Sequence, residues 1–421
     1  MSAANATPSA LAVTNAIDEA CAHWANGNVD GALASCNRAL AIDPSSVPAL
    51  VNTGTIMWLN GDVVSAERLY ARAHELDPTH IGVMLNIATL RNEEGDLERS
   101  LQWIEKAQAA RPASQEVVWR RALIELAMGD YVDGWAHYEA GLGHADMRGK
   151  NPGFKTLPWD GIPCRRLLIW HEQGFGDTVQ FVRYAKLCKE RAEKVTVLCP
   201  PELVSLLRSC PAVDDAVAAV RAGDFDQHIS IMSLPYRFRT TVDTIPAPIP
   251  YLFADERLAA KWHHRMRGPG LRVGLVWSGN VRKHQLRFQV IDRNRRLSLE
   301  AMQPWLDLPS ITFYSLQKGE SQKEAEGRNI VDWMDEVDDF ADTAAIIANL
   351  DLVISADTSV AHVAGAMGKR VWVLSRLDAC WRWLRNRPDS PWYPTARVFG
   401  QTERGSWRSV VDAVREELTR L

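Results

Sequence analysis

The sequence predicts an α-helical solenoid followed by two consecutive α/β halves, each built on a parallel sheet. Three observations lead to this prediction. Residues 13–148 repeat with a period of 34 residues, the chain from residue 165 onward alternates short apolar runs with helical patterns, and the two regions carry net charges of opposite sign. A length of 421 residues is enough for two to four domains.

The repeat is marked by glycines and prolines. Four glycines follow one another at intervals of 34 residues, and three prolines keep the same interval. Each glycine stands where two helices would be joined by a turn with positive φ, and each proline follows a helix that it cannot continue. The residues are Gly27, Gly61, Gly95 and Gly129, with Pro44, Pro78 and Pro112.

This pattern predicts four helix–turn–helix units over residues 13–148, after a disordered tail at 1–12. The units resemble the tetratricopeptide repeat, whose concave arrays bind peptides or proteins. The alternative is that the array only supports the domain that follows. A segment rich in Gly and Pro, residues 149–164, is predicted to be the linker to that domain.

Strand and helix patterns alternate twice after the linker, which indicates two parallel sheets with crossover helices. We place a first Rossmann-like domain at 165–255 and a second at 256–421. Ligands in such sheets bind outside the carboxyl ends of the strands. The strand-length apolar runs include 165–172, 194–199, 271–277, 311–317, 350–357 and 369–374.

Charge and composition exclude several classes of protein. Residues 1–148 carry a net charge of −9 and residues 149–421 carry +5, for a total of −4, which argues against general nucleic-acid binding. No apolar run is long enough to span a membrane, and the N-terminus lacks the pattern of a signal peptide. The seven cysteines have no C-x-x-C spacing, so we expect a cytoplasmic protein with reduced thiols.

Three loops are predicted at the carboxyl ends of strands. The first is residues 173–178, and the second is residues 278–280, which run into an arginine-rich stretch suited to phosphate. The third, residues 357–359, opens a helix whose backbone N–H groups can bind an anion. No Walker A motif occurs, so NTP hydrolysis is not favoured.

Taken together, several segments resemble a known family over residues 155–415. They include WHEQGFGDTVQFVRYA, VGLVWSGN, LDLVISADTSVAHVAGAMGK and WRWLRNRPDSPWYP. These segments are similar to the glycosyltransferase domain of bacterial tetratricopeptide proteins, which resembles the lipopolysaccharide heptosyltransferases and, more distantly, the protein O-N-acetylglucosamine transferases. The resemblance implies the GT-B fold, a nucleotide-sugar donor held by the second domain, and transfer with inversion that needs neither a metal ion nor a cofactor.

The resemblance also implies site residues. Asp177 matches the family's candidate base, and its loop would face the acceptor with Glu172, Gln173, Gly174 and Gly176. The residues expected to bind the nucleotide sugar are Ser278, Gly279, Asn280, Arg295, Gln317, Lys318, Asp357, Thr358, Ser359 and His362.

Alternatives remain open at this point. Asp177 could only cap the helix that follows it, and His171 or Glu172 could be the base instead. The acceptor is expected to be a protein recruited by the repeats. The alternatives are a glycan or lipid-linked saccharide as acceptor, or a non-catalytic repeat scaffold with a degenerate GT-B domain. The sequence leaves open the nucleotide base, the sugar, the acceptor and the oligomeric state.

Overall fold

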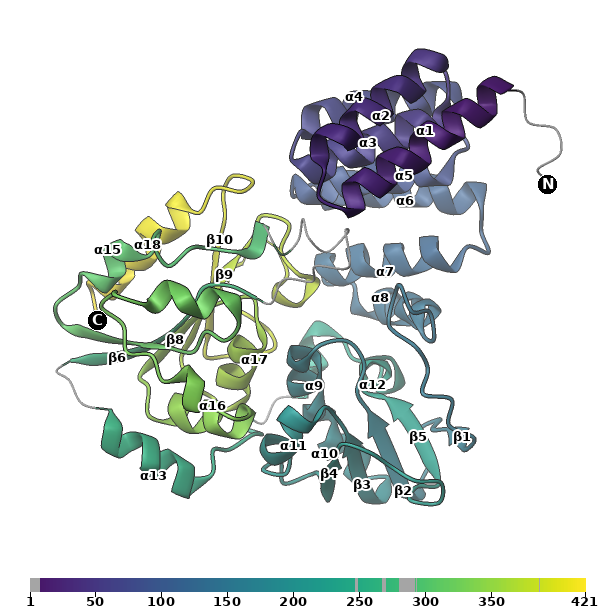
Figure 1. Ribbon diagram of the computed structural model, residues 1–421. Helices are drawn as coiled ribbons and strands as arrows, with labels where there is room; N and C mark the ends of the chain where they lie inside the picture. The colour runs from purple at the N-terminus through teal and green to yellow at the C-terminus, as the bar shows by residue number, and fades with distance from the viewer. Residues whose placement is uncertain (1–7, 247–248, 267–269, 280–291, 293, 386) are drawn as a thin grey trace. The chain divides into compact units, whose positions relative to one another are not determined.

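The computed structural model describes residues 8–246, 249–266, 270–279, 292, 294–385 and 387–421. These residues form two compact units (Figure 1). The first contains the chain up to Ile124, and the second contains Glu125–Asn280 and Asn294–Leu421. The boundary falls inside a helix of the last repeat. The end of the helical array therefore belongs to the unit that carries the sheets.

The repeat region consists of helix pairs, as the 34-residue period predicts, with its first helix beginning at Pro8, inside the segment predicted as a tail, and its last ending at Tyr138. Its helices follow one another in pairs, and the first helix of each pair leads into the second through a glycine turn. They are α1 (Pro8–Ala25), α2 (Val29–Ile42), α3 (Val47–Asn60), α4 (Val63–Leu76), α5 (Ile81–Glu93), α6 (Leu97–Ala110), α7 (Gln115–Met128) and α8 (Tyr131–Tyr138).

Local chemistry explains why each turn forms where it does. All four turn glycines have positive φ, between 74° and 97°, a region that favours glycine. The residue after each glycine caps the next helix by accepting a hydrogen bond from a backbone N–H three positions on. These capping residues are Asn28, Asp62, Asp96 and Asp130.

The first sheet has the strand order β1-β5-β2-β3-β4, and all of its strands are parallel. Its strands are β1 (Leu157–Pro158), β2 (Cys164–Trp170), β3 (Ala192–Leu198), β4 (Asp215–Val217) and β5 (Gln227–Ser230). Its helices include α9 (Phe175–Phe181), α10 (Ala185–Lys189), α11 (Pro201–Leu207) and α12 (Leu234–Arg237). The strand order reverses between β2 and β5. Part of the segment predicted as a linker contributes the edge strand β1.

The second sheet has the order β10-β9-β8-β6-β7, again parallel throughout. Its strands are β6 (Leu271–Val276), β7 (Ile311–Ser315), β8 (Leu352–Ala356), β9 (Val371–Ser375) and β10 (Ala396–Gly400). Its helices include α13 (Glu256–Arg265), α15 (Gln303–Leu306), α16 (Phe340–Ala348), α17 (Ser359–Ala366) and α18 (Arg408–Leu418). Here the order reverses between β6 and β8. The predicted fold class, a helical solenoid followed by two Rossmann-like halves, is confirmed.

Buried aromatic side chains connect α8 to both sheet-bearing halves of the second unit. Trp135 of α8 meets Phe181 of α9 and Trp381 of the second half with ring centroids 5.8 and 5.1 Å apart. The indole nitrogen of Trp392 donates to the Tyr131 hydroxyl at 3.0 Å. Such rings bury large apolar areas, so they join these parts of the unit into one core. No helix in the described part of the chain is long and apolar enough to cross a membrane.

Candidate functional site

The first predicted loop leaves the carboxyl end of β2 and enters α9. Gly174 is the N-cap of α9, and its backbone N–H donates to Oδ2 of Asp177 at 2.8 Å. Asp177 therefore closes the start of its own helix, which is the capping role that the sequence left open. Its other carboxylate oxygen, Oδ1, points away from this contact.

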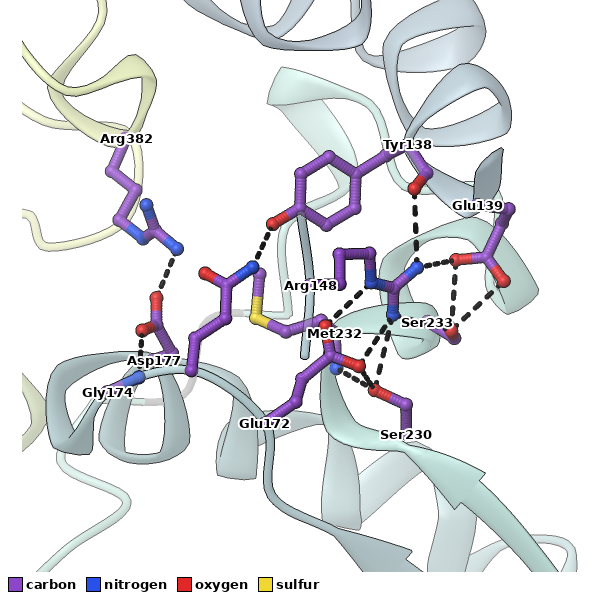
Figure 2. A network of polar contacts seen from close by, with 11 residues as sticks. Tyr138, Glu139, Arg148, Glu172, Gly174, Asp177, Ser230, Met232, Ser233 and Arg382 are labelled. Carbon is purple, nitrogen blue, oxygen red and sulfur yellow. Dashed lines mark hydrogen bonds and ion pairs between the residues drawn. The ribbon is translucent and has the colours of Figure 1, made fainter. Parts of the chain in front are cut away.

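Oδ1 of Asp177 is bound by Arg382, which follows β9 in the second half (Figure 2). Only 15% of the Asp177 side chain and 10% of the Arg382 side chain are exposed. The guanidinium also donates to Sγ of Cys380 at 3.1 Å and lies 4.1 Å from the centroid of Trp381. Burial would lower the pKa of Arg382, but the Asp177 carboxylate raises it overall, so the guanidinium stays charged.

The third predicted loop leaves β8 and enters α17. Oδ1 of Asp357 accepts a hydrogen bond from the indole N–H of Trp383 at 2.9 Å, and Arg295 donates to the Asp357 carbonyl at 3.2 Å. Burial alone would raise the pKa of Asp357, but His362 and Arg295 lower it below its ordinary value. Thr358 is the N-cap of α17, and its side chain makes no capping hydrogen bond to the helix. The N–H groups at this helix start are therefore not covered by the cap side chain.

His362 lies one turn into α17 and is buried. Nδ1 is 2.9 Å from the Tyr393 hydroxyl, and the ring stacks on Trp383 with centroids 5.3 Å apart. Burial is the largest cause that lowers the pKa of His362 to about 4. The imidazole is therefore neutral near pH 7 and can serve as a hydrogen-bonding group.

The first and third loops, which are far apart in the sequence, come together at Gly176. A Cβ atom at this position would lie 2.7 Å from Cδ2 of His362 and 3.5 Å from Cα of Ser359. The missing side chain thus lets the start of α9 approach the start of α17. As a result, Asp177 on α9 and His362 on α17, which belong to different sheet-bearing halves, share one neighbourhood.

The second predicted loop follows β6 and is braced from β7. Oε1 of Gln317 accepts hydrogen bonds from the backbone N–H groups of Trp277 and Ser278 at 3.1 and 2.8 Å. Gln317 therefore shapes the loop, and the oxygen of its side-chain amide already accepts two hydrogen bonds. The ammonium group of Lys318 donates to the carbonyl oxygen of Val337.

Gly279 allows Arg295 to approach this loop, because a Cβ there would lie 2.1 Å from Nη2 of Arg295. Arg295 therefore links the second loop to the carbonyl of Asp357 in the third. The neighbouring Arg296 pairs instead with Glu324 at 2.7 Å. Asn280, the last predicted residue of the second loop, lies outside the described residues.

The two alternative bases have structural partners. Glu172 is 5% exposed and makes a bidentate pair with Arg148, with Nε–Oε1 and Nη2–Oε2 distances of 2.6 and 2.9 Å. Burial raises the pKa of Glu172, and Arg148 opposes the rise. His171 lies 3.2 Å from the carbonyl oxygen of Leu198, and burial lowers its pKa. Glu172 is thus a partner in a buried ion pair.

Sequence reasoning missed four residues of this site. These residues are Tyr138, Arg148, Arg382 and Trp383, and the last of them holds Asp357. The available signal for Arg382 was a basic residue between two tryptophans. Among the residues that the structure describes, no group of three or more His, Cys, Asp or Glu side chains is placed to hold a metal ion.

Comparisons with known proteins identify part of the helical array. Residues 17–81 match a family model described as tetratricopeptide repeat. These residues are tetratricopeptide repeats. The chain is 27% identical over 333 residues to Protein FlbA of Caulobacter vibrioides, a match that covers 70% of this chain and 53% of that protein. The chain therefore spans about half the length of this relative.

Two solved structures are similar to the chain at low sequence identity. An O-GlcNAc transferase from Thermobaculum terrenum matches 99% of this chain and 94% of its own, with 14% identity and a TM-score of 0.35. A glycosyl transferase family 9 protein from Veillonella parvula matches 62% of this chain and 96% of its own, with 11% identity and a TM-score of 0.44.

Proposed function

We propose that this chain is a GT-B type glycosyltransferase that moves a sugar from a nucleotide-sugar donor to an acceptor, with inversion and without a metal ion or cofactor. The observation that carries the proposal is the approach of the Asp177 loop to the start of α17 at Gly176. One sheet thereby presents a carboxylate beside a helix start of the other sheet, at the carboxyl ends of their strands. A transfer reaction that holds the acceptor on one half and the donor on the other needs this arrangement.

In the proposed reaction, Asp177 accepts the proton of the acceptor hydroxyl while the acceptor oxygen attacks C1 of the donor sugar. The bond between C1 and the phosphate oxygen of the donor breaks, and the negative charge passes to the leaving nucleotide. Backbone N–H groups at the start of α17, together with Arg295, would stabilise this charge. Since Arg382 and Gly174 donate to the two oxygens of Asp177, Arg382 must release Oδ1 before that oxygen can take the proton.

On the donor side we assign two kinds of residue. Some would touch the nucleotide sugar, and these are Ser278, Gly279, Arg295, Thr358, Ser359 and His362. The others shape the loops. Gln317 accepts hydrogen bonds from the second loop, and Asp357 of the third loop accepts one from Trp383. Lys318, whose ammonium group already has a carbonyl partner, would need to move to reach a ligand.

The acceptor that we propose is a protein recruited by the tetratricopeptide repeats, because such arrays present concave surfaces that bind peptides or proteins. We place the reaction in the cytoplasm, since all seven cysteines are free thiols. The alternative acceptor is a glycan or a lipid-linked saccharide, in which case the repeats would serve assembly.

The test is a thermal-shift panel of ADP-, GDP-, UDP- and CMP-sugars, followed by assay of sugar release from the donor that stabilises the protein. A donor present at 100 times its Kd should stabilise the folded chain by about 2.7 kcal/mol. Stabilisation together with sugar release supports the proposal, and no stabilisation by any donor would refute it. Stabilisation without sugar release or transfer would favour a non-catalytic scaffold. The ion pair that occupies Asp177 is the observation in favour of that second candidate.

A further inference from the structure

The loop that carries Asp177 is held by residues from outside the first sheet (Figure 2). Glu172 pairs with Arg148 through two hydrogen bonds of 2.6 and 2.9 Å. The side-chain amide of the next residue, Gln173, donates to the Tyr138 hydroxyl at 2.6 Å. Tyr138 is the last residue of α8, and Arg148 follows ten residues later. Two consecutive loop residues are thus anchored to the end of the last helical repeat.

Gln173 needs such an anchor because its backbone is in the left-handed region, with φ of 63°. This conformation is unfavourable for a residue with a Cβ atom and persists where surrounding contacts hold it. The next residue, Gly174, donates its N–H to Asp177 at 2.8 Å. The backbone direction at Gln173 therefore determines where α9 begins and where its Asp177 carboxylate points.

Arg148 occupies the place between β2 and β5 where the strand order of the first sheet reverses. Its side chain is fully buried, and it donates to Ser230 and Ser233 at 3.2 and 2.9 Å and to Glu139 at 2.6 Å. Ligands of open parallel sheets commonly bind at this crevice. Here the Arg148 guanidinium bonds Glu172, which follows β2, and Ser230, the last residue of β5.

We propose that Tyr138 and Arg148 are positioning residues for Asp177, so that the end of the tetratricopeptide array forms part of the acceptor side of the site. The role of Asp177 as base rests on the proposed function, whereas the ordering of its loop does not. Burial raises the pKa of Tyr138, so its hydroxyl is neutral and able to accept the Gln173 hydrogen bond.

The repeat supplies a matched control for this proposal. Tyr70 stands 68 residues, or two periods, before Tyr138 and is also buried. Its hydroxyl lies 3.1 Å from the Thr55 hydroxyl, which belongs to the same repeat. Tyr70→Phe and Tyr138→Phe therefore remove the same atom from the same repeat position, and only Tyr138→Phe removes a contact to the loop.

The test is amide hydrogen exchange of the full chain, followed in peptides that cover residues 171–178. Tyr138→Phe should accelerate exchange at the start of α9 about 3- to 10-fold, as expected for the loss of one hydrogen bond of ordinary strength. Tyr70→Phe should leave these peptides unchanged. Equal exchange in the wild type and in Tyr138→Phe would overturn the proposal, and so would equal acceleration in both variants.

Gln173→Gly provides a second test, which stands alone if Tyr138→Phe does not fold. Glycine accepts the positive φ but cannot bond Tyr138, so this variant should also accelerate exchange. Where Tyr138→Phe folds, combining the two substitutions should add nothing further. An additive effect would mean that Tyr138 acts elsewhere. Unchanged exchange in Gln173→Gly would overturn the proposal as well.

Turnover separates positioning from a purely structural role. The probe is the nucleotide sugar from the ADP, GDP, UDP or CMP series that the wild type hydrolyses. Tyr138→Phe should lower kcat about tenfold, which corresponds to about 1.4 kcal/mol, with the donor KM unchanged because the donor loops keep their contacts. A rise in KM alone would contradict positioning of Asp177. If the wild type hydrolyses none of these donors, the proposed function fails, and the exchange experiment still decides the positioning role.

Discussion

Replacing Asp177 by Asn should reduce both stability and rate, and the structure allows the two losses to be separated. Asn still offers an oxygen to the Gly174 N–H, so the helix start is largely kept. The charge opposite Arg382 is lost, however. Removing one partner of a buried ion pair costs about 3–5 kcal/mol. Because the two side chains are 10% and 15% exposed, we expect somewhat less, about 2–4 kcal/mol.

The assay combines thermal unfolding with turnover of the donor. A loss of this size should lower Tm by roughly 5–15 °C. Adding Arg382→Met to Asp177→Asn removes the unpaired charge, so the double variant should regain about half of the lost stability or more. The rate should fall about 10²–10⁴-fold in Asp177→Asn and stay low in the double variant, because neither protein has the base. Arg382→Met alone keeps the base and should stay within about tenfold of the wild type.

Two results would refute this reasoning. A loss of rate below about tenfold in Asp177→Asn would show that Asp177 is not the base. If Glu172→Gln or His171→Ala then caused the large loss, the role would pass to that neighbour. A double variant no more stable than Asp177→Asn would show that the ion pair with Arg382 does not set the stability cost.

Three further predictions follow from the helix starts, the buried histidine and the unit boundary. Ser359→Pro removes one N–H at the first position of α17, where proline is tolerated, so the fold should persist. Titration calorimetry should show that the donor binds roughly tenfold more weakly. Unchanged affinity would place the donor phosphates elsewhere. Burial lowers the pKa of His362 from 6.5 to about 4, so its contribution of about 3 kcal/mol is complete above pH 6.5 and is lost as pH falls towards 4. Urea unfolding of His362→Gln should show a correspondingly flatter stability curve in that window, and parallel curves would contradict a neutral buried ring. Deleting residues 1–124 should leave a folded second unit with a cooperative thermal transition. Deleting residues 1–148 also removes Arg148 and should abolish that transition. Equal thermal transitions in the two truncated proteins would contradict a unit boundary at Ile124.

Much of the fold could be predicted from the sequence because its signals are local. A glycine that permits positive φ and an acidic residue that caps the next helix are neighbours in the chain, and their recurrence at 34 residues predicts the helix pairs. Apolar runs of strand length, each followed by a helical pattern, predict the parallel sheets. In a parallel sheet the carboxyl ends of all strands lie at one edge, so the sequence alone predicts the loops with Asp177, Ser278 and Asp357 as candidates.

The contacts of those loops depended on the tertiary structure. Arg382 is 205 residues from Asp177, and Tyr138 is 35 residues from Gln173. Nothing in the local pattern around an arginine or a tyrosine shows whether its polar group meets solvent or a distant loop. That choice depends on how the ends of non-adjacent strands and the last repeat pack together, and burial then turns each contact into a strong constraint. The sequence by itself determined which loops lie at the carboxyl ends of the strands, and only the tertiary structure decided which side chains hold them there.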